Sequence, residues 1–239
     1  MIDSAPDASP TPRAGRGVEE REISIPPIGL AGDLRVPSAA KAIVAFVHGS
    51  GSGRLSPRNR SVAEALNRHR IATLLFDLLT VAEESDRANV FDIPLLAERL
   101  VAAVRWLDQE PAVAGLPLGL FGASTGAAAA LVAAAQLDDR VGAIVSRGGR
   151  PDLAGRALDR ISVPTLLIVG GADVPVIELN RQAFARLRGA KALEIVPGAS
   201  HLFPERRALE AVMGHAAAWF EHHLVSSAAE PVETARSKQ

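Results

Sequence analysis

The sequence contains no cysteine. This absence excludes disulfide bridges, thiolate metal sites and a cysteine nucleophile. A chain without disulfides suits a reducing compartment, so we expect a cytoplasmic protein. Its 26 basic and 27 acidic side chains nearly cancel, which leaves a formal net charge of −1. Such a balance gives no electrostatic reason to expect binding to nucleic acid or to an anionic membrane surface.

Long apolar runs are also absent. No uninterrupted apolar stretch approaches the roughly 18 residues that a membrane-spanning helix needs. The first residues contain aspartates and prolines but neither the basic nor the apolar region of a secretory signal, so we expect no such leader. Hydrophobic residues still make up 48% of the 239 residues, which is ample for the core of one sizeable α/β domain.

Short apolar segments alternate with helical patterns along the chain. Continuous apolar runs at 42–47 and 71–76 predict strands that are buried on both faces of a sheet. Residues 93–108 repeat apolar side chains at helical spacing, whereas the charged residues 81–89 are predicted to form a connector. The alternation predicts an α/β fold with a mainly parallel sheet and helices on both faces. Further strands are expected at 22–25, 29–36, 118–121, 141–145, 166–169 and 193–196, with helices at 57–69, up to 137, at 176–187 and around 209–220.

The domain boundaries follow from changes in composition. Residues 1–20 are rich in proline, alanine, serine, aspartate and glycine and lack apolar periodicity, so we expect a disordered tail there. The polar residues 226–239 are expected to form a second disordered tail. Residues 21–225 are then one α/β domain. Its connection between Val145 and Leu166 is too short for a large cap domain, so the active site should be open.

The stretch 119–126 reads Gly-Leu-Phe-Gly-Ala-Ser-Thr-Gly and precedes a run of alanines. A short apolar strand, G-x-S-x-G and a small-residue helix form the nucleophile-elbow pattern, which places a serine on a sharp strand-to-helix turn. The turn forces the serine backbone into a sparsely populated conformation and requires very small neighbours. Ser124 is therefore the candidate nucleophile, with Gly122 and Gly126 as the small flanking residues.

A serine hydroxyl needs a base to accept its proton, and the base needs a third group to orient it. In a sheet of parallel strands, such groups gather beyond the carboxyl ends of the strands. Asp173 follows the strand expected at 166–169, and His201 follows the strand expected at 193–196. The chain order Ser124, Asp173, His201 is that of the α/β-hydrolase triad. Each residue alone has an ordinary explanation as part of a turn or surface loop, but the three positions in this order favour a triad.

The glycine-rich loop 48–53 follows the strand expected at 42–47. At this position an acyl-transfer enzyme supplies one N–H of the oxyanion hole, and the residue after the nucleophile supplies the other. We assign these donors to Ser50, with Gly51 as the alternative, and to Thr125. A phosphate cradle is the competing interpretation, but the loop lacks the Gly-Lys-Ser/Thr ending of a P-loop and the glycine spacing of a dinucleotide site. His48 is expected to hold the loop by hydrogen bonds.

Arginines gather at the same sheet edge. Arg147 follows the strand expected at 141–145, and Arg58 follows the glycine-rich loop. Guanidinium groups suit two-point binding of carboxylate or phosphate, so we expect these residues, together with Gly51, to contact the substrate, which would carry an anionic group. The alternative is that Arg147 pairs with a local acid such as Asp152 or Asp77 and only holds its loop.

The segments 122–126, 170–173 and 198–201 resemble the dienelactone hydrolase-like branch of the α/β-hydrolase superfamily, and the similarity covers about residues 22–224. The segments 48–53, 56–60 and 146–151 are similar to a subgroup of small hydrolase domains that are sometimes fused behind a phosphoribosyltransferase domain, of which no signature is present. The resemblance implies an α/β-hydrolase fold and ester or related acyl hydrolysis. Dienelactone hydrolases proper use a cysteine where this chain has Ser124, so their lactone substrate does not carry over.

Our first hypothesis is a serine hydrolase that cleaves small carboxylic esters, lactones or thioesters through an acyl-enzyme, without cofactor or metal. A second hypothesis is a catalytically silent binding protein with the α/β-hydrolase fold. The third and weakest is nucleotide or phosphate binding at the glycine-rich loop. Reactivity of the serine distinguishes the first hypothesis from the other two.

Overall fold

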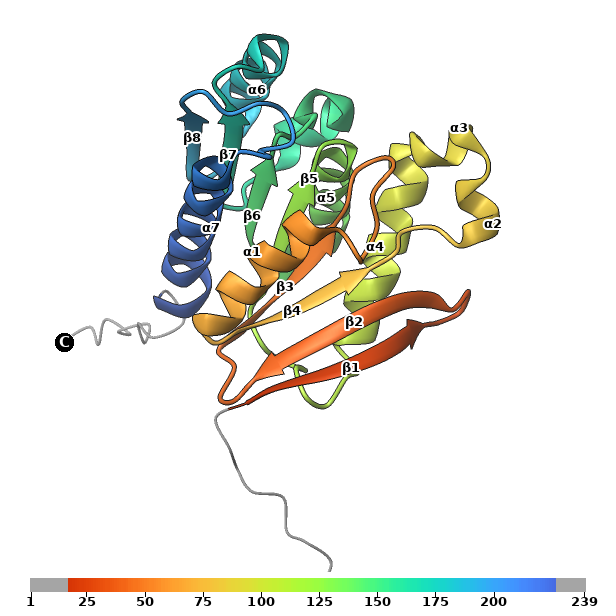
Figure 1. Ribbon diagram of the computed structural model, residues 1–239. Coiled ribbons are helices and arrows are strands. Elements are labelled where there is room, and N and C mark those ends of the chain that lie inside the picture. Colours follow the sequence, from red (N-terminus) through yellow and green to blue (C-terminus); the bar gives the residue numbers. More distant parts are fainter. Residues whose placement is uncertain (1–16, 227–239) are drawn as a thin grey trace, which may run out of the picture.

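A computed structural model describes residues 17–226, and eight strands form one sheet in the order β1-β2-β4-β3-β5-β6-β7-β8 (Figure 1). The first two strands are antiparallel to their neighbours, and the other six are parallel. The predicted mainly parallel sheet is therefore confirmed. The strands are β1 (Val18–Ile25), β2 (Leu30–Pro37), β3 (Ala42–Val47), β4 (Ile71–Phe76), β5 (Leu118–Ala123), β6 (Val141–Arg147), β7 (Thr165–Gly170) and β8 (Lys191–Val196).

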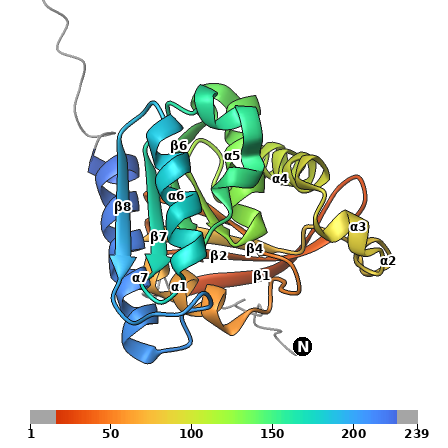
Figure 2. The ribbon, with the colours of Figure 1, turned by 90° about the horizontal axis from the view of Figure 1, so that it is seen from above.

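Helices cover both faces of the sheet. Seen from above, α1 and α7 lie on one side, and α4, α5 and α6 lie on the other (Figure 2). The α-helices are α1 (Pro57–Arg68), α2 (Val81–Glu84), α3 (Arg87–Val90), α4 (Ile93–Leu107), α5 (Thr125–Leu137), α6 (Val174–Arg186) and α7 (Arg206–Phe220). Three further helical segments are η1 (Asp138–Arg140), η2 (Pro151–Arg160) and η3 (Glu221–Ser226).

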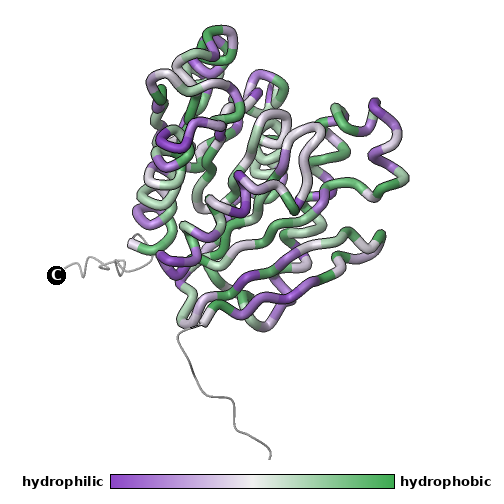
Figure 3. Tube along the Cα trace, in the orientation of Figure 1, coloured by the Kyte–Doolittle hydropathy of each residue, from purple (hydrophilic) through white to green (hydrophobic). Residues whose placement is uncertain are grey.

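Burial follows the apolar runs of the sequence. Strands β3, β4, β5 and β7 are buried along their whole length, whereas the edge strand β1 is mostly exposed. Figure 3 shows the same contrast, with apolar central strands and hydrophilic stretches along β1. Parallel strands covered by helices on both sides have no solvated face, so their sequences need no polar alternation.

One predicted domain boundary differs from the structure. Strand β1 begins at Val18, inside the tail predicted for 1–20, because this end pairs with the end of β2 at Pro37. The remaining parts of the two predicted disordered tails, 1–16 and 227–239, lie outside the described residues.

The prediction of a charged connector at 81–89 is wrong in detail, because two short helices form in this segment. Thr80 and Glu83 form a reciprocal capping box at the start of α2, and the Asp86 side chain caps α3. Such caps satisfy the free N–H groups of a first helical turn, so even a charged four-residue segment adopts a helical turn. The connection between β6 and β7 holds only η2, as expected for a fold without a large cap domain.

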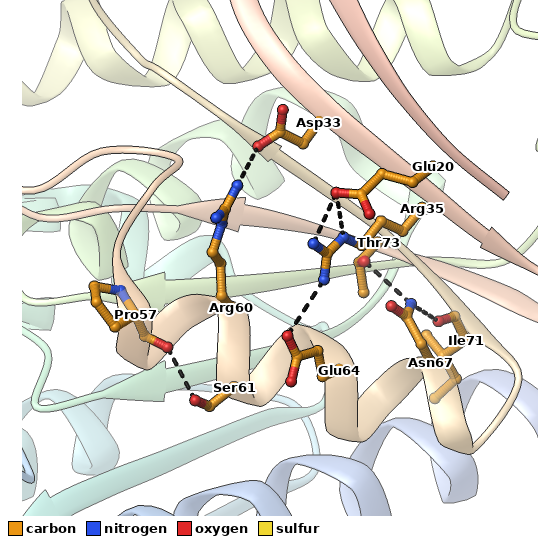
Figure 4. A network of polar contacts seen from close by, with 10 residues as sticks. All are labelled: Glu20, Asp33, Arg35, Pro57, Arg60, Ser61, Glu64, Asn67, Ile71 and Thr73. Carbon is orange, nitrogen blue, oxygen red and sulfur yellow. Dashed lines mark hydrogen bonds and ion pairs between the residues drawn. The ribbon is translucent and has the colours of Figure 1, made fainter. Parts of the chain in front are cut away.

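Polar contacts hold the antiparallel edge of the sheet against α1 (Figure 4). Asp33 is buried on β2 and pairs with Arg60 of α1 at 3.3 Å. Arg35 of β2 binds Glu20 of β1 at 2.7 Å. The buried Asn67 amide donates to two acceptors on β4. Because buried polar groups are costly unless paired, these contacts fix how α1 lies over the strands.

The glycine-rich loop after β3 is tied to the end of β4 by His48. The Leu78 N–H donates to His48 Nε2 at 3.0 Å, so Nδ1 carries the ring proton and donates to Gly49 O at 3.1 Å. The predicted anchoring role of His48 is therefore confirmed. Burial lowers the pKa of His48, because the surroundings of the ring solvate its charged form poorly.

This depressed pKa predicts a pH-dependent loss of stability. As the pH falls below about 6.5, the unfolded chain takes up a proton at His48 that the folded protein resists, so stability falls. Uptake of one proton can change the free energy of unfolding by at most about 1.4 kcal/mol per pH unit. In His48→Gln, thermal denaturation should show a smaller drop in melting temperature between pH 7.5 and 5.5 than in the wild type. Equal drops in the two proteins would show that His48 does not contribute.

Candidate active site

Ser124 lies at the junction between β5 and α5 with φ 51° and ψ −123°. This is the strained backbone expected at a nucleophile elbow, since non-glycine residues rarely adopt a positive φ. A Cβ at Gly122 would lie 2.5 Å from the Ala127 Cα, and a Cβ at Gly126 would collide with the carbonyls that end β3. The predicted need for very small residues on both sides of Ser124 is therefore confirmed.

Hydrogen bonds from the loop after β6 fix the strained turn. The Ser124 N–H donates to Arg147 O at 3.3 Å, and the Arg150 N–H donates to Ser124 O at 3.0 Å. The glycine-rich loop approaches from another side, because a Cβ at Gly49 would lie 2.8 Å from the Ser124 Cβ. The nucleophile backbone is thus held by two loops at the carboxyl edge of the sheet.

Asp173 and His201 come together as the chain order predicts. His201 Nδ1 lies 2.7 Å from Asp173 Oδ2, and the two side chains are 37% and 15% exposed. Asp173 occupies the cap position of α6, yet its side chain makes no capping bond and is directed at the histidine instead. A carboxylate at Nδ1 holds the ring in the tautomer that leaves Nε2 free to accept a proton.

The loops that carry these two residues are bonded to each other. The Ala172 N–H donates to Ala199 O at 2.9 Å, and the Gly171 N–H donates to Val196 O at 2.8 Å. Glu205 accepts from the Ser200 hydroxyl at 2.9 Å and so restrains the residue before His201. These bonds hold the carboxylate and the imidazole in register across two neighbouring strands.

The histidine also packs against the loop that holds the nucleophile. A Cβ at Gly148 would lie 2.7 Å from His201 O and 3.7 Å from its Nδ1. Gly148 follows Arg147, whose carbonyl binds Ser124. The sequence analysis missed this contact, although the paired glycines at 148 and 149 were a visible signal of close approach by another part of the chain.

The predicted oxyanion donors lie side by side, with one difference from expectation. The Ser50 N–H donates to Thr125 Oγ1 at 3.1 Å, so it already has a partner within the protein. Gly51, the alternative donor, has φ +67° and is exposed. Thr125 is the first residue of α5, so its own N–H has no acceptor within the helix.

Arg147 does not pair with either acid suggested by the sequence. The Asp152 carboxylate accepts hydrogen bonds from Arg150 at 2.8 and 2.9 Å. The Asp77 carboxylate accepts from the backbone N–H of Arg54 and also pairs with the Arg54 guanidinium. The alternative interpretation, in which Arg147 pairs with Asp152 or Asp77, is therefore wrong, because these carboxylates bind Arg150 and Arg54 instead. The polar neighbour of this guanidinium is Asn59, at 3.5 Å from Nη2, and no motif in the sequence indicated this contact.

A cleft lies on the other side of the glycine-rich loop from β5. Its walls are residues 48–53, the end of β4, and apolar side chains from the segment that includes α2, α3 and the start of α4. Within residues 17–226 we find no cluster of acids and histidines that could hold a metal ion. No helix in the same part of the chain is long and apolar enough to cross a membrane.

Comparison with known proteins agrees with this architecture. A crystal structure of a dienelactone hydrolase from Anabaena variabilis is 52% identical, covers 87% of this chain and 99% of its own, and superposes with a TM-score of 0.84. Est1E from Butyrivibrio proteoclasticus is only 15% identical and covers 84% of this chain and 98% of its own. Its TM-score of 0.71 shows that the fold is shared.

A protein of Mycobacterium tuberculosis named "Putative phosphoribosyl transferase" is 56% identical over 206 residues. The match covers 86% of this chain and 46% of that protein, so the chain spans about half the length of this relative. The sequence model of the family described as "Dienelactone hydrolase family" matches residues 77–226. This segment includes all three triad candidates. The chain belongs to the dienelactone hydrolase family.

Proposed function

We propose that this protein is a serine hydrolase that cleaves carboxylic esters, lactones or thioesters of small molecules. The observation that carries the proposal is the strained Ser124 turn beside the hydrogen-bonded pair Asp173–His201. Membership of a hydrolase family supports hydrolysis as the reaction. The ester specificity and the roles of the three residues are our own inference from the geometry.

In the first half of the reaction, Ser124 Oγ attacks the carbonyl carbon of the substrate while its proton passes to His201 Nε2. Asp173 stabilises the imidazolium that forms and keeps the ring oriented. The tetrahedral intermediate collapses, the bond to the leaving alcohol or thiol breaks, and that group takes the proton from His201. The acyl group remains attached to Ser124 as an ester.

In the second half, His201 accepts a proton from water, and the hydroxide attacks the acyl-enzyme. Collapse of this intermediate releases the carboxylic acid and returns the proton to Ser124. In both halves the Thr125 N–H, with the N–H of Ser50 or Gly51, would stabilise the negative oxygen. Ser50 could serve only by giving up or sharing its bond to Thr125 Oγ1. One such donor is typically worth about 3–4 kcal/mol in the transition state.

The transferase name of the mycobacterial relative describes a protein of which this chain matches 46%. We assign hydrolysis, and no phosphoribosyl transfer, to this chain, because Ser124, His201 and Asp173 have the chemistry of a nucleophile, a base and an orienting carboxylate. A cytoplasmic location remains a prediction from the absence of cysteine.

Substitutions in the triad test the mechanism. Ser124→Ala should reduce kcat on 4-nitrophenyl butyrate at least about a thousandfold, because only substrate binding and the oxyanion hole then remain. His201→Ala should be nearly as severe, because triad members act as a unit. Asp173→Asn should retain more activity than either. Circular dichroism and melting curves establish that the variants are folded.

Ser146→Ala is a matched control, because this buried serine lies one strand away and its hydroxyl has no hydrogen-bond partner in the structure. It should retain activity within a few-fold of the wild type. Ser124→Ala activity above a thousandth of the wild-type value would mean that another group is the nucleophile.

The open edge predicts a preference for short acyl chains. A long chain gains about 0.8 kcal/mol for each methylene group only where a covered apolar tunnel buries it. The β6–β7 connection supplies no such cover, since it holds only η2. The kcat/KM for 4-nitrophenyl esters should therefore be highest between about two and six acyl carbons. A steady rise to twelve carbons would contradict an open site.

A further inference from the structure

Arg147 is a buried cation without a counter-charge. Its side chain leaves the carboxyl end of β6, and the residue is only 6% exposed. Its Nε and Nη1 have no hydrogen-bond partner, and Nη2 has only a long contact of 3.5 Å to Asn59 Oδ1. Burial, with the nearby charge of Arg58, lowers the pKa of Arg147 to about 10, so it still carries its charge at pH 7. Buried charges are normally paired, so this arrangement calls for a partner.

Three acids near this part of the sheet edge are already paired with other arginines. Asp152 is bound by Arg150, and Asp77 is bound by Arg54. Asp33 is bound by Arg60 of α1 (Figure 4). Throughout residues 17–226, no carboxylate forms an ion pair with Arg147. A local acid therefore does not explain why the arginine is buried here.

The first turn of α1 adds one further backbone donor at the same place, the Arg58 N–H, because Pro57 has no N–H and Ser56 accepts from the Asn59 N–H. This helix has twelve residues and no acidic side chain in its first turn, so its positive end is not neutralised from within. Arg58 lies in that turn with its Nε buried and without a hydrogen-bond partner. Two guanidinium groups and a helix N-terminus thus converge where repulsion alone would separate them.

The cluster of Arg147, Arg58 and the first turn of α1 is connected to Ser124 and His201 through the backbone. Ser124 donates its N–H to the carbonyl of Arg147, and the adjacent Gly148 packs against His201. The Arg147 backbone therefore lies beside Ser124, and its guanidinium reaches Asn59 in the first turn of α1.

We propose that Arg147, Arg58 and the N-terminus of α1 form a subsite for an anionic group of the substrate, which is a carboxylate or a phosphate. The proposal names a substrate class for the proposed hydrolase. It rests on the hydrolase assignment, because only an enzyme has a substrate to which the bound anion could belong. A planar guanidinium matches two oxygens of either group through parallel N–H bonds. Arg58 is the more exposed of the two and faces the solvent side of the subsite.

Binding can be measured without turnover. Ser124→Ala protein is titrated with inorganic phosphate, succinate and 3-phosphonopropanoate while its melting temperature is followed, with sodium chloride at matched ionic strength as reference. We expect a saturable rise with at least one of the three anions, because a ligand that binds only the folded state stabilises it. The response to phosphate or to carboxylate alone identifies which group the subsite takes.

The same titration on Ser124→Ala/Arg147→Met should show no such rise. Without added anion, this double variant should melt at or above the temperature of Ser124→Ala, since it loses an unpaired buried charge. A rise that persists without Arg147 places the anion elsewhere and overturns the proposal. No rise with any of the anions also overturns it, whatever the enzyme does with neutral esters.

Kinetics give a second measurement on the otherwise wild-type enzyme. The 4-nitrophenyl monoesters of succinate and of 3-phosphonopropanoate are compared with neutral 4-nitrophenyl pentanoate. In Arg147→Met, the ratio of kcat/KM for the preferred anionic ester to that for the neutral ester should fall about 10- to 100-fold, mainly through KM. Arg147→Lys should recover part of the ratio, because it restores the charge without the planar fork.

Arg150→Met is the matched control, because this arginine lies in the same loop but is paired with Asp152. It should leave the ratio unchanged. An equal loss on charged and neutral esters in Arg147→Met would make Arg147 a structural residue. An equal fall of the ratio in Arg150→Met would mean that the general charge of this edge, and no defined subsite, attracts the anion. Failure of the hydrolase assignment has a different signature, which is the absence of turnover on every ester while the anion still raises the melting temperature.

Discussion

The structure depends on one strained residue. Ser124 has a backbone conformation that costs of order 1–3 kcal/mol, and it persists only where its surroundings leave no alternative. Gly122 and Gly126 allow β5 and α5 to meet closely enough to form the turn. The loop after β6 then accepts from the Ser124 N–H and donates to its carbonyl. The strain is therefore balanced by contacts that also place the serine at the carboxyl edge of the sheet.

The same loop links the nucleophile to the rest of the site. Arg147 supplies the carbonyl that binds Ser124, and Gly148 supplies the surface against which His201 packs. The loops after β7 and β8 are bonded to each other, so Asp173 and His201 form one unit. Four neighbouring strands thus contribute to one catalytic edge. Because six strands are parallel, their carboxyl ends meet there, which is why side chains distant in sequence converge.

This regularity explains what could be predicted from the sequence. Fully buried parallel strands read as apolar runs, and a residue that follows such a run must lie at the catalytic edge. The pairing of Asp173 with His201 could therefore be predicted from their places after two strands and from the chain order Ser124, Asp173, His201. The short helices α2 and α3 did not, because their stability comes from local capping by Thr80 and Asp86 within a charged segment. The early start of β1 was missed because its pairing with β2 is a long-range property.

The partners and the burial of Arg147 could not be predicted from the sequence. The sequence showed that Arg147 follows a strand, and Asp152 and Asp77 were candidate partners for it. Which arginine takes which acid is decided by distances in the folded chain, and there Arg150 and Arg54 hold Asp152 and Asp77. Burial without a carboxylate is a property that no spacing rule predicts. Among the described residues, the Arg147 guanidinium has Asn59 as its polar neighbour and no carboxylate partner.

The reactivity of Ser124 tests the central claim most directly. Intact-protein mass spectrometry after treatment with a fluorophosphonate should show a single adduct, and peptide mapping should place it on Ser124. The Ser124→Ala protein should remain unmodified under the same conditions, because only a serine activated by a neighbouring base reacts with such a probe. No adduct on folded wild-type protein, or an adduct on another residue, would contradict the assignment of Ser124, His201 and Asp173 as a catalytic triad.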